Sequence, residues 1–195
     1  MIQRIGVIYQ DVNSRGFLEG LRDRLNCEAE LIRPTSHIGR QRVMRRRDLK
    51  TAWRDFRNQN VDLVVRFTDA DGNPWTSVQR TELDRTPDDA RPRWVCGVAV
   101  DRPEDWLALD PDYLATRLDV SAAELRNAAT RTGHVKKVIE RASASSKSVT
   151  VRDIVRSAPT EVFRRWLSGC DSLRSFYQDC RQATARQDCD TTNEL

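Results

Sequence analysis

The stretch Val-Asp-Leu-Val-Val-Arg-Phe-Thr-Asp-Ala-Asp-Gly-Asn, residues 61–73, places the strongest constraint on how this chain folds. Its short run of β-branched and aromatic residues is typical of a strand buried inside an α/β sheet. Asp69 and Asp71 follow this run, and alternate residues of an extended chain point to the same side. We therefore expect their carboxylates to converge at the carboxyl edge of the sheet, where a hard cation such as Mg²⁺ finds oxygen ligands.

A surface turn is the alternative interpretation of residues 69–74. Asp, Gly, Asn and Pro are the commonest turn residues, so the segment Asp-Ala-Asp-Gly-Asn-Pro fits a turn that binds no metal. These six residues alone leave both interpretations open, and the rest of the chain has to decide between them.

Strand-like and helix-like segments alternate before residue 110. Besides the run before Asp69, strand patterns cover residues 2–9, 28–33 and 93–100. A first helical pattern starts at a cap on Asn13 or Ser14 and has Phe17, Leu18, Leu21 and Leu25 on one face. A second covers residues 39–59 and has Leu49, Trp53 and Phe56 on one face. A third starts within residues 74–83. Such alternation predicts a Rossmann-like α/β fold with a mainly parallel sheet of about four strands.

The pattern changes to helices beyond residue 110. Helical segments are predicted over residues 111–118, 121–129, 134–142, 151–156, 159–167 and 171–185, with a polar, mobile link over 143–150. We therefore divide the chain into an α/β domain (1–110), a helical extension packed on it (111–186) and a flexible tail (187–195).

Composition limits the classes of function. The chain has 33 Lys and Arg against 29 Asp and Glu, and this net charge of +4 is too small to indicate nucleic-acid binding by itself. The five cysteines show no paired metal spacing, and their odd number argues against a closed disulfide framework. Because no apolar stretch could span a bilayer and no signal peptide is evident, we expect a soluble, cytoplasmic protein without membrane contact.

One segment concentrates positive charge. Between residues 40 and 57 lie eight basic residues and two acidic ones, a net charge of +6 that exceeds that of the whole chain. Such a stripe predicts contacts with the phosphates of DNA or RNA through Arg42, Arg45, Arg46, Arg47 and Lys50. A solvated helix face, or a surface complementary to an acidic partner, explains the same charges equally simply.

The order of the strand ends resembles a known family. Ile8-Tyr9-Gln10-Asp11, Asp69-Ala-Asp-Gly72 and Glu104-Asp-Trp-Leu107 each follow a predicted strand, and Cys170-Asp-Ser-Leu-Arg-Ser-Phe-Tyr lies in a late helix. Together they resemble the TOPRIM domain of topoisomerases, primases and overcoming-lysogenisation-defect (OLD) nucleases. More narrowly, the chain is similar to a small prokaryotic branch of TOPRIM-like proteins, and the likeness spans nearly its whole length.

This resemblance implies a metal-dependent nuclease. Asp69, Asp71 and Glu104 would hold Mg²⁺ or Mn²⁺ for phosphodiester cleavage. The chain departs from the family pattern after the first strand, where Gln10 stands at the position of a Glu that acts as acid and base. Glutamine cannot titrate, so Asp11 would have to substitute, although a shift of one residue on a strand reverses the side that it faces. Ser14 and Arg102 also stand where relatives have acids.

The departures leave a second interpretation open, a TOPRIM-fold subunit that has lost catalysis and serves in binding or regulation. In either case the likeness implies an ABC-type ATPase as partner, because relatives are encoded beside one in systems resembling antiphage (antiviral) defence. The chain has no phosphate-binding Gly-x-x-x-x-Gly-Lys loop, so ATP hydrolysis would come from that partner. An oligomeric assembly is compatible with both interpretations.

Overall fold

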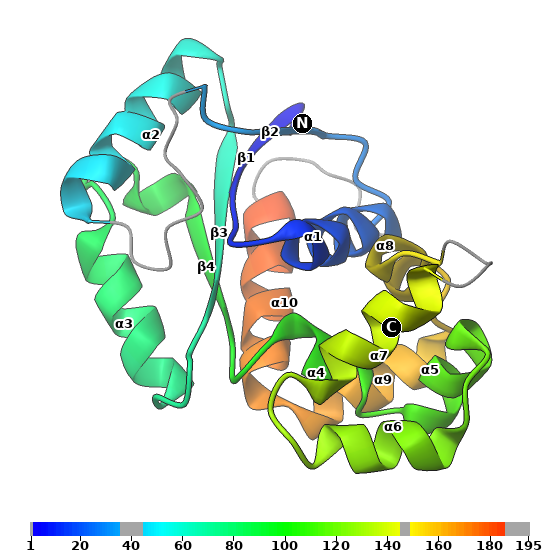
Figure 1. The fold of residues 1–195 in the computed structure, drawn as a ribbon. Coiled ribbons are helices and arrows are strands. Elements are labelled where there is room, and N and C mark those ends of the chain that lie inside the picture. The colour runs from blue at the N-terminus through cyan, green and yellow to red at the C-terminus, as the bar shows by residue number, and fades with distance from the viewer. Residues whose placement is uncertain (1, 36–44, 145–148, 186–195) are drawn as a thin grey trace.

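A parallel sheet organises the protein, whose computed structural model describes residues 2–35, 45–144 and 149–185 (Figure 1). Within these residues the strands are β1 (Arg4–Ile8), β2 (Glu30–Ile32), β3 (Leu63–Asp69) and β4 (Trp94–Ala99). All pairings are parallel and the order is β2-β1-β3-β4. The predicted Rossmann-like α/β fold with about four parallel strands is therefore confirmed.

Strand β3 lies in the middle of the sheet, and both of its faces are covered. Leu63, Val65 and Phe67 belong to one hydrophobic cluster, whereas Val64 belongs to another, as expected from the two-residue period of a strand. Arg66 shares the second face and is only 3% exposed, and its ion pair with Glu82 compensates the buried charge. A continuous buried run thus reflects two covering layers.

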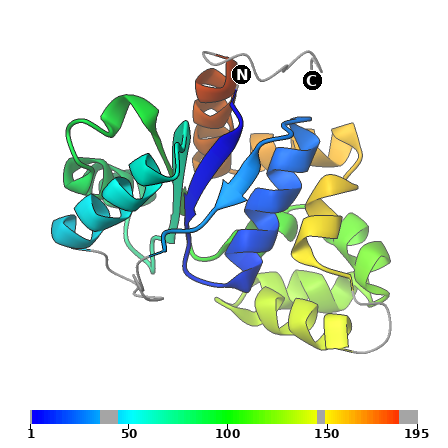
Figure 2. The ribbon, with the colours of Figure 1, turned by 90° about the horizontal axis from the view of Figure 1, so that it is seen from above.

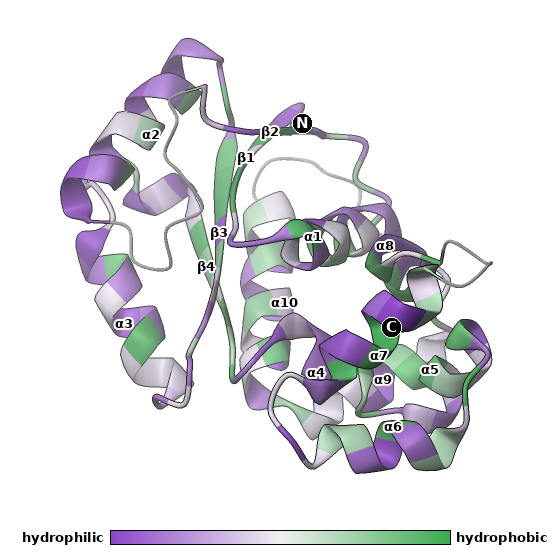
Figure 3. Ribbon diagram, viewed as in Figure 1, coloured by the Kyte–Doolittle hydropathy of each residue, from purple (hydrophilic) through white to green (hydrophobic). Residues whose placement is uncertain are grey.

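Helices form these layers. The bounds in the first part of the chain are α1 (Val12–Arg24), α2 (Arg46–Asn58) and α3 (Trp75–Arg85), with a 3₁₀ turn over Arg91–Arg93. Figures 1 and 2 show α2 and α3 on one face and α1 and α10 on the other. Leu49, Trp53 and Phe56 of α2 are buried as predicted, and much of the rest of α2 is hydrophilic in Figure 3. Residues 39–44 of the predicted helix lie outside the described residues.

The later part of the described chain is helical, as predicted. Its elements are α4 (Pro103–Leu107), α5 (Pro111–Leu118), α6 (Ala122–Ala129), α7 (His134–Ala142), α8 (Val151–Arg156), α9 (Thr160–Gly169) and α10 (Asp171–Ala185). All but α4 match segments predicted from the sequence. The central part of the predicted link, residues 145–148, and the predicted tail lie outside the described residues. No helix in the described ranges is long and apolar enough to span a membrane.

Helix α10 joins the helical region to the sheet. Its Phe176 packs against Phe67 of β3, with the ring centroids 5.4 Å apart. Gly97 of β4 permits this contact, because a Cβ atom there would lie 2.7 Å from Phe176 and 2.8 Å from Phe67. A single hydrophobic cluster runs from the strands through α1 and α4 to the C-terminal helices. The two regions therefore share one core.

Candidate functional site

Three carboxylates meet at the carboxyl edge of the sheet. Asp11 follows β1, Asp69 ends β3, and Glu104 lies in the short helix after β4. The carboxyl ends of parallel strands lie at one edge, so their connections approach one another. The negative charges of Asp11 and Glu104 both act on Asp69. We refer to these three residues as the carboxylate cluster.

Asp11 caps helix α1. Its Oδ1 accepts hydrogen bonds from the backbone N and the Oγ of Ser14, both at 2.8 Å, and its Oδ2 forms an ion pair with Lys136. The cap predicted at Asn13 or Ser14 was therefore wrong, since Asp11 has the extended backbone of an N-cap and Ser14 is its donor. Burial raises the pKa of Asp11, but the bonds from Lys136 and Ser14 outweigh burial and leave the pKa below its usual value.

Glu104 is almost completely buried, at 1% exposure. Asn13 Nδ2 donates to its Oε1 at 2.6 Å, and Lys136 Nζ lies 3.9 Å from the same oxygen. Its Oε2 is buried without a hydrogen-bond partner among the described residues. Burial raises the pKa of Glu104, and the Asn13 hydrogen bond and the charge of Lys136 only partly oppose this. This carboxylate is thus held in place with one oxygen unsatisfied.

Asp69 has the most perturbed acidity in the cluster. Burial, followed by the charges of Asp11, Glu104 and Asp71, raises its pKa to about 7. Its Oδ1 is buried and has no hydrogen-bond partner in the described part of the chain. A carboxyl group with such a pKa can hold or release a proton near neutral pH, as acid and base catalysis requires.

Asp71 and Gln10, also predicted for the site, have different surroundings. Asp71 is exposed, and its φ of 49° places it in a left-handed turn just after the strand has ended. The extended backbone that would point Asp69 and Asp71 to the same side therefore ends at Asp69. Residues 71–72 form a turn, as the alternative interpretation of residues 69–74 predicted. Gln10 Nε2 donates to Thr68 Oγ1 at 2.9 Å, which joins the ends of β1 and β3.

Lys136 of α7 is a site residue that was not predicted from the sequence. It bridges Asp11 and Glu104, although it lies 125 positions from Asp11 in the chain. Burial lowers its pKa, but the hydrogen bond and charge of Asp11, with the charge of Glu104, more than compensate and raise it. Asp105 was also missed. Burial and the charges of Glu104 and Asp101 raise its pKa to about 6.

The donor atoms suit a hard cation, but the site is not a preformed cage. Carboxylate oxygens are the ligands that Mg²⁺ prefers, and the unpartnered oxygens of Asp69 and Glu104 are available for it. Among the described residues, however, no three His, Cys, Asp or Glu side chains form a group that could hold a metal. Lys136 supplies the positive charge between Asp11 and Glu104. Asp69 and Glu104 are the residues that would hold such an ion.

The basic stripe lies on the exposed side of α2. Arg45, Arg46, Arg47 and Lys50 are all exposed, while Arg42 lies outside the described residues. Part of the charge is neutralised locally: Arg46 pairs with Asp88 at 3.3 Å, and Arg57 of the same helix pairs with Asp89 at 3.5 Å. The stripe is accessible to a partner but less positive than its sequence indicates.

Comparison with known proteins yields no relative. No protein-family model, curated protein or solved structure matches this chain.

Proposed function

We propose that this protein is a TOPRIM-like, metal-dependent nuclease that cleaves phosphodiester bonds. The observation that carries the proposal is the convergence of Asp11, Asp69 and Glu104, from three neighbouring strand ends, with the pKa of Asp69 raised to about 7. Surplus negative charge in a partly buried place costs stability, and functional sites are where such a cost is commonly found. The order of the acidic motifs along the chain supports the same assignment.

Each residue has a distinct role in this proposal. Asp69 and Glu104 would hold Mg²⁺ or Mn²⁺, and Asp71, in the exposed turn after β3, would add negative charge beside Asp69. The ion neutralises a phosphate and activates water when bound. Asp11 keeps Lys136 beside the cluster, where its ammonium group can contact a phosphate oxygen. Gln10 orients the end of β1 through Thr68 and transfers no proton.

A catalytically inactive subunit is the second candidate. Two observations favour it. Gln10 stands where the family has a titratable Glu, and its side chain is hydrogen-bonded to Thr68. The positive charge of Lys136 already compensates the charges of Asp11 and Glu104. In that case the protein binds or regulates a partner and cleaves nothing. Both candidates include an ABC-type ATPase as partner in an antiphage defence system, which would supply the ATP hydrolysis.

Nucleic acid would also contact the exposed side of α2. Arg45, Arg46, Arg47 and Lys50 form an exposed stripe, and neutralised phosphates release counterions, so binding should weaken as salt rises. Affinity for DNA and RNA is measured at two salt concentrations, for the wild type and for Arg45, Arg46 and Arg47 changed to Glu. Unchanged affinity in the triple variant would remove the stripe from the proposal.

Metal binding tests the nuclease proposal most directly. Titration calorimetry with Mn²⁺ and Mg²⁺ should show binding that Asp69→Asn abolishes, whereas Asp84→Asn, which removes an exposed acid of α3, should leave it intact. Plasmid, single strands and tRNA are then incubated with the protein, alone and with the ATPase encoded beside it. Metal-dependent cleavage lost in Asp69→Asn supports the nuclease. Intact substrates under all these conditions favour the inactive subunit.

A further inference from the structure

A cavity opens between α1 and the ends of β1 and β2, and its lining residue Tyr9 is two positions from Asp11 in the sequence. It has a volume of about 180 Å³ and is lined by Val7, Tyr9, Arg15, Leu18, Leu31 and Arg33. Leu18 packs in the core beneath it, whereas the two arginines are exposed. The cavity therefore has an apolar base and a positively charged opening.

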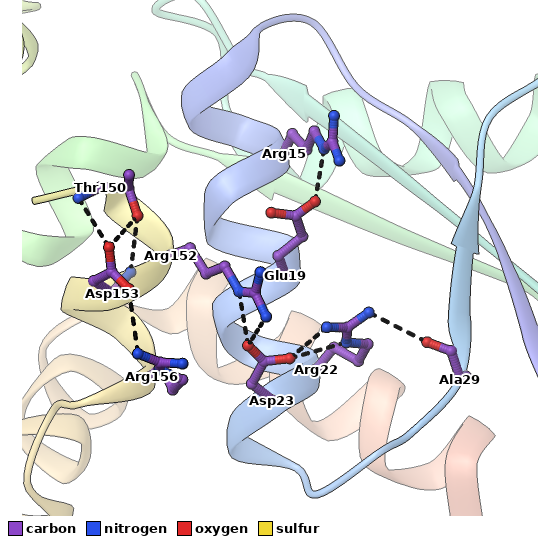
Figure 4. A network of polar contacts seen from close by, with 9 residues as sticks. All are labelled: Arg15, Glu19, Arg22, Asp23, Ala29, Thr150, Arg152, Asp153 and Arg156. Carbon is purple, nitrogen blue, oxygen red and sulfur yellow. Dashed lines mark hydrogen bonds and ion pairs between the residues drawn. The ribbon is translucent and has the colours of Figure 1, made fainter. Parts of the chain in front are cut away.

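The two arginines have capacity for a ligand. Arg33 has no carboxylate partner among the described residues, and its guanidinium lies 4.8 Å from the centre of the Tyr9 ring. Arg15 contacts Glu19 through Nε at 2.6 Å, and its terminal nitrogens make no contact in the network of Figure 4. A guanidinium offers five donors in a fixed plane, so several remain on each residue for one anion.

The surroundings favour an anion of moderate size. Stacking on Tyr9 restricts Arg33 without using its hydrogen-bond donors, which lowers the entropy lost when a ligand binds. Arginine matches the geometry of phosphate oxygens, because two parallel N–H groups can meet two oxygens. The cavity admits a phosphate group with a few water molecules. Glu19 lowers the net positive charge at the opening, so an anion would be held mainly by the free guanidinium N–H groups.

The position of the cavity links it to the candidate active site. Tyr9 lines the cavity, Gln10 comes next and bonds to Thr68, and Asp11 then belongs to the carboxylate cluster. Adjacent phosphates of one nucleic-acid strand could thus occupy both places. If the cluster holds a cation and the cavity an anion, the two sites are complementary in charge and both lie near the carboxyl end of β1.

We infer that this cavity binds a phosphate group, with Arg15 and Arg33 as its ligands and Tyr9 as the platform that positions Arg33. The source that we assign is the backbone of a nucleic-acid strand, next to the phosphodiester at the carboxylate cluster. This assignment of the source rests on the proposed function. The phosphate site itself does not, because it is built from residues outside the cluster.

The test measures phosphate binding in the absence of metal. Full-length protein in EDTA and low salt is titrated with inorganic phosphate, a mononucleotide and a short single-stranded oligonucleotide. Arg15→Gln and Arg33→Gln should each weaken phosphate binding about tenfold, the effect of one charge-assisted contact, and the double variant should abolish it. Arg174→Gln is the matched control, because Arg174 is an exposed helix residue paired with Asp171 one turn away, as Arg15 is with Glu19. Its affinity should equal that of the wild type.

Each outcome has a defined meaning. Wild-type protein that binds no phosphate, or a double variant that binds it normally, overturns the inference. Loss of phosphate and oligonucleotide binding in the same variants supports a nucleic-acid source. If the protein binds phosphate or the mononucleotide but not the oligonucleotide, the phosphate site is supported and the nucleic-acid source is overturned. Because no metal is present, a failure of the nuclease proposal leaves these results unaffected.

Discussion

Asp69 carries a stability cost that a purely structural residue would not. Its pKa is about 7 in the folded protein against an ordinary 3.8, because burial and three nearby carboxylates disfavour its charge. A raised pKa means that the unfolded chain ionises first, so the folded state loses stability as pH rises from about 4 to about 7. The charged form of Asp69 is therefore unfavourable in the folded protein at neutral pH.

Asp69→Asn should therefore stabilise the metal-free protein at alkaline pH. We expect the free energy of unfolding to rise by about 2 kcal/mol at pH 8. This is roughly half the full effect of the pKa shift, because solvent screens the charges at the site. At pH 4 the free energy of unfolding should change little. Urea denaturation in EDTA measures both values. Asp84→Asn should change neither, and an equal gain at the two pH values would contradict the explanation.

Lys136 is the counter-charge of the cluster, so its removal should have the opposite effect. Lys136→Met leaves Asp11 and Glu104 without their cation, and we expect unfolding to become easier by about 1–3 kcal/mol. Millimolar Mg²⁺ should recover part of this loss and should bind more tightly than to the wild type. Thermal unfolding with and without Mg²⁺ measures both effects. Lys137→Met, which changes an exposed neighbouring lysine, is the control. If Lys136→Met loses stability and Mg²⁺ recovers none of it, the result would count against a cation site.

At the scale of elements, charged contacts fasten α1 to α8. Asp23 of α1 accepts a hydrogen bond from Arg152 Nε of α8 at 2.8 Å and pairs with Arg22 at 2.5 Å, as Figure 4 shows. The helices also approach closely at Gly20, where a Cβ atom would lie 2.7 Å from Val155 and 2.8 Å from the carbonyl oxygen of Arg152. Polar contacts and close packing thus set the position of α8 on α1.

The pairing of Asp23 predicts acid sensitivity. Burial raises its pKa, but the bonds from Arg22 and Arg152 outweigh burial and lower it overall. A lowered pKa contributes stability above the unfolded value, and this contribution disappears as pH falls through the folded value. Asp23→Asn should cost about 1 kcal/mol at neutral pH and progressively less as the pH falls from neutral to below about 4. Urea unfolding across this range tests it, and a constant difference would contradict it.

At the scale of the whole molecule, α10 makes the sheet and the helical region interdependent. Phe176 occupies the space left by Gly97 and contacts Phe67. Gly97→Ala should force both rings to move and destabilise the protein by about 1–3 kcal/mol, a typical cost of overpacking. Hydrogen exchange should then quicken in β4 and α10 together. Gly169→Ala, whose Cβ would meet only Leu109 at 3.4 Å, is the control, and faster exchange in α10 alone would argue against a shared core.

Local patterns in the sequence predicted the elements well. The apolar run before Asp69 predicted β3, and the i, i+4, i+7 spacing of Leu49, Trp53 and Phe56 predicted the buried face of α2. Both signals arise from the side-chain period of the element itself, so they do not depend on distant residues. The parallel sheet then followed from the alternation of strands and helices.

The site was only partly accessible from the sequence, because its members come together through tertiary contacts. Asp69 was predicted from its place at a strand end and Glu104 from the family resemblance. Lys136 was not predicted, since only the packing of α7 brings it to Asp11. Asp71 departs from the expected alternation because the chain turns left-handed directly after the strand.

By itself, the sequence determined the order and type of the elements and the edge of the sheet where acidic residues gather, because these depend on local periodicity. Only the tertiary structure decided which charges face one another. It paired Lys136 with Asp11 and placed Arg15 and Arg33 around one cavity. Within the described part of the chain, it also left one oxygen of Asp69 and one of Glu104 without a hydrogen-bond partner. Those pairings depend on distances between segments far apart in the chain, and burial then sets the strength of each charge.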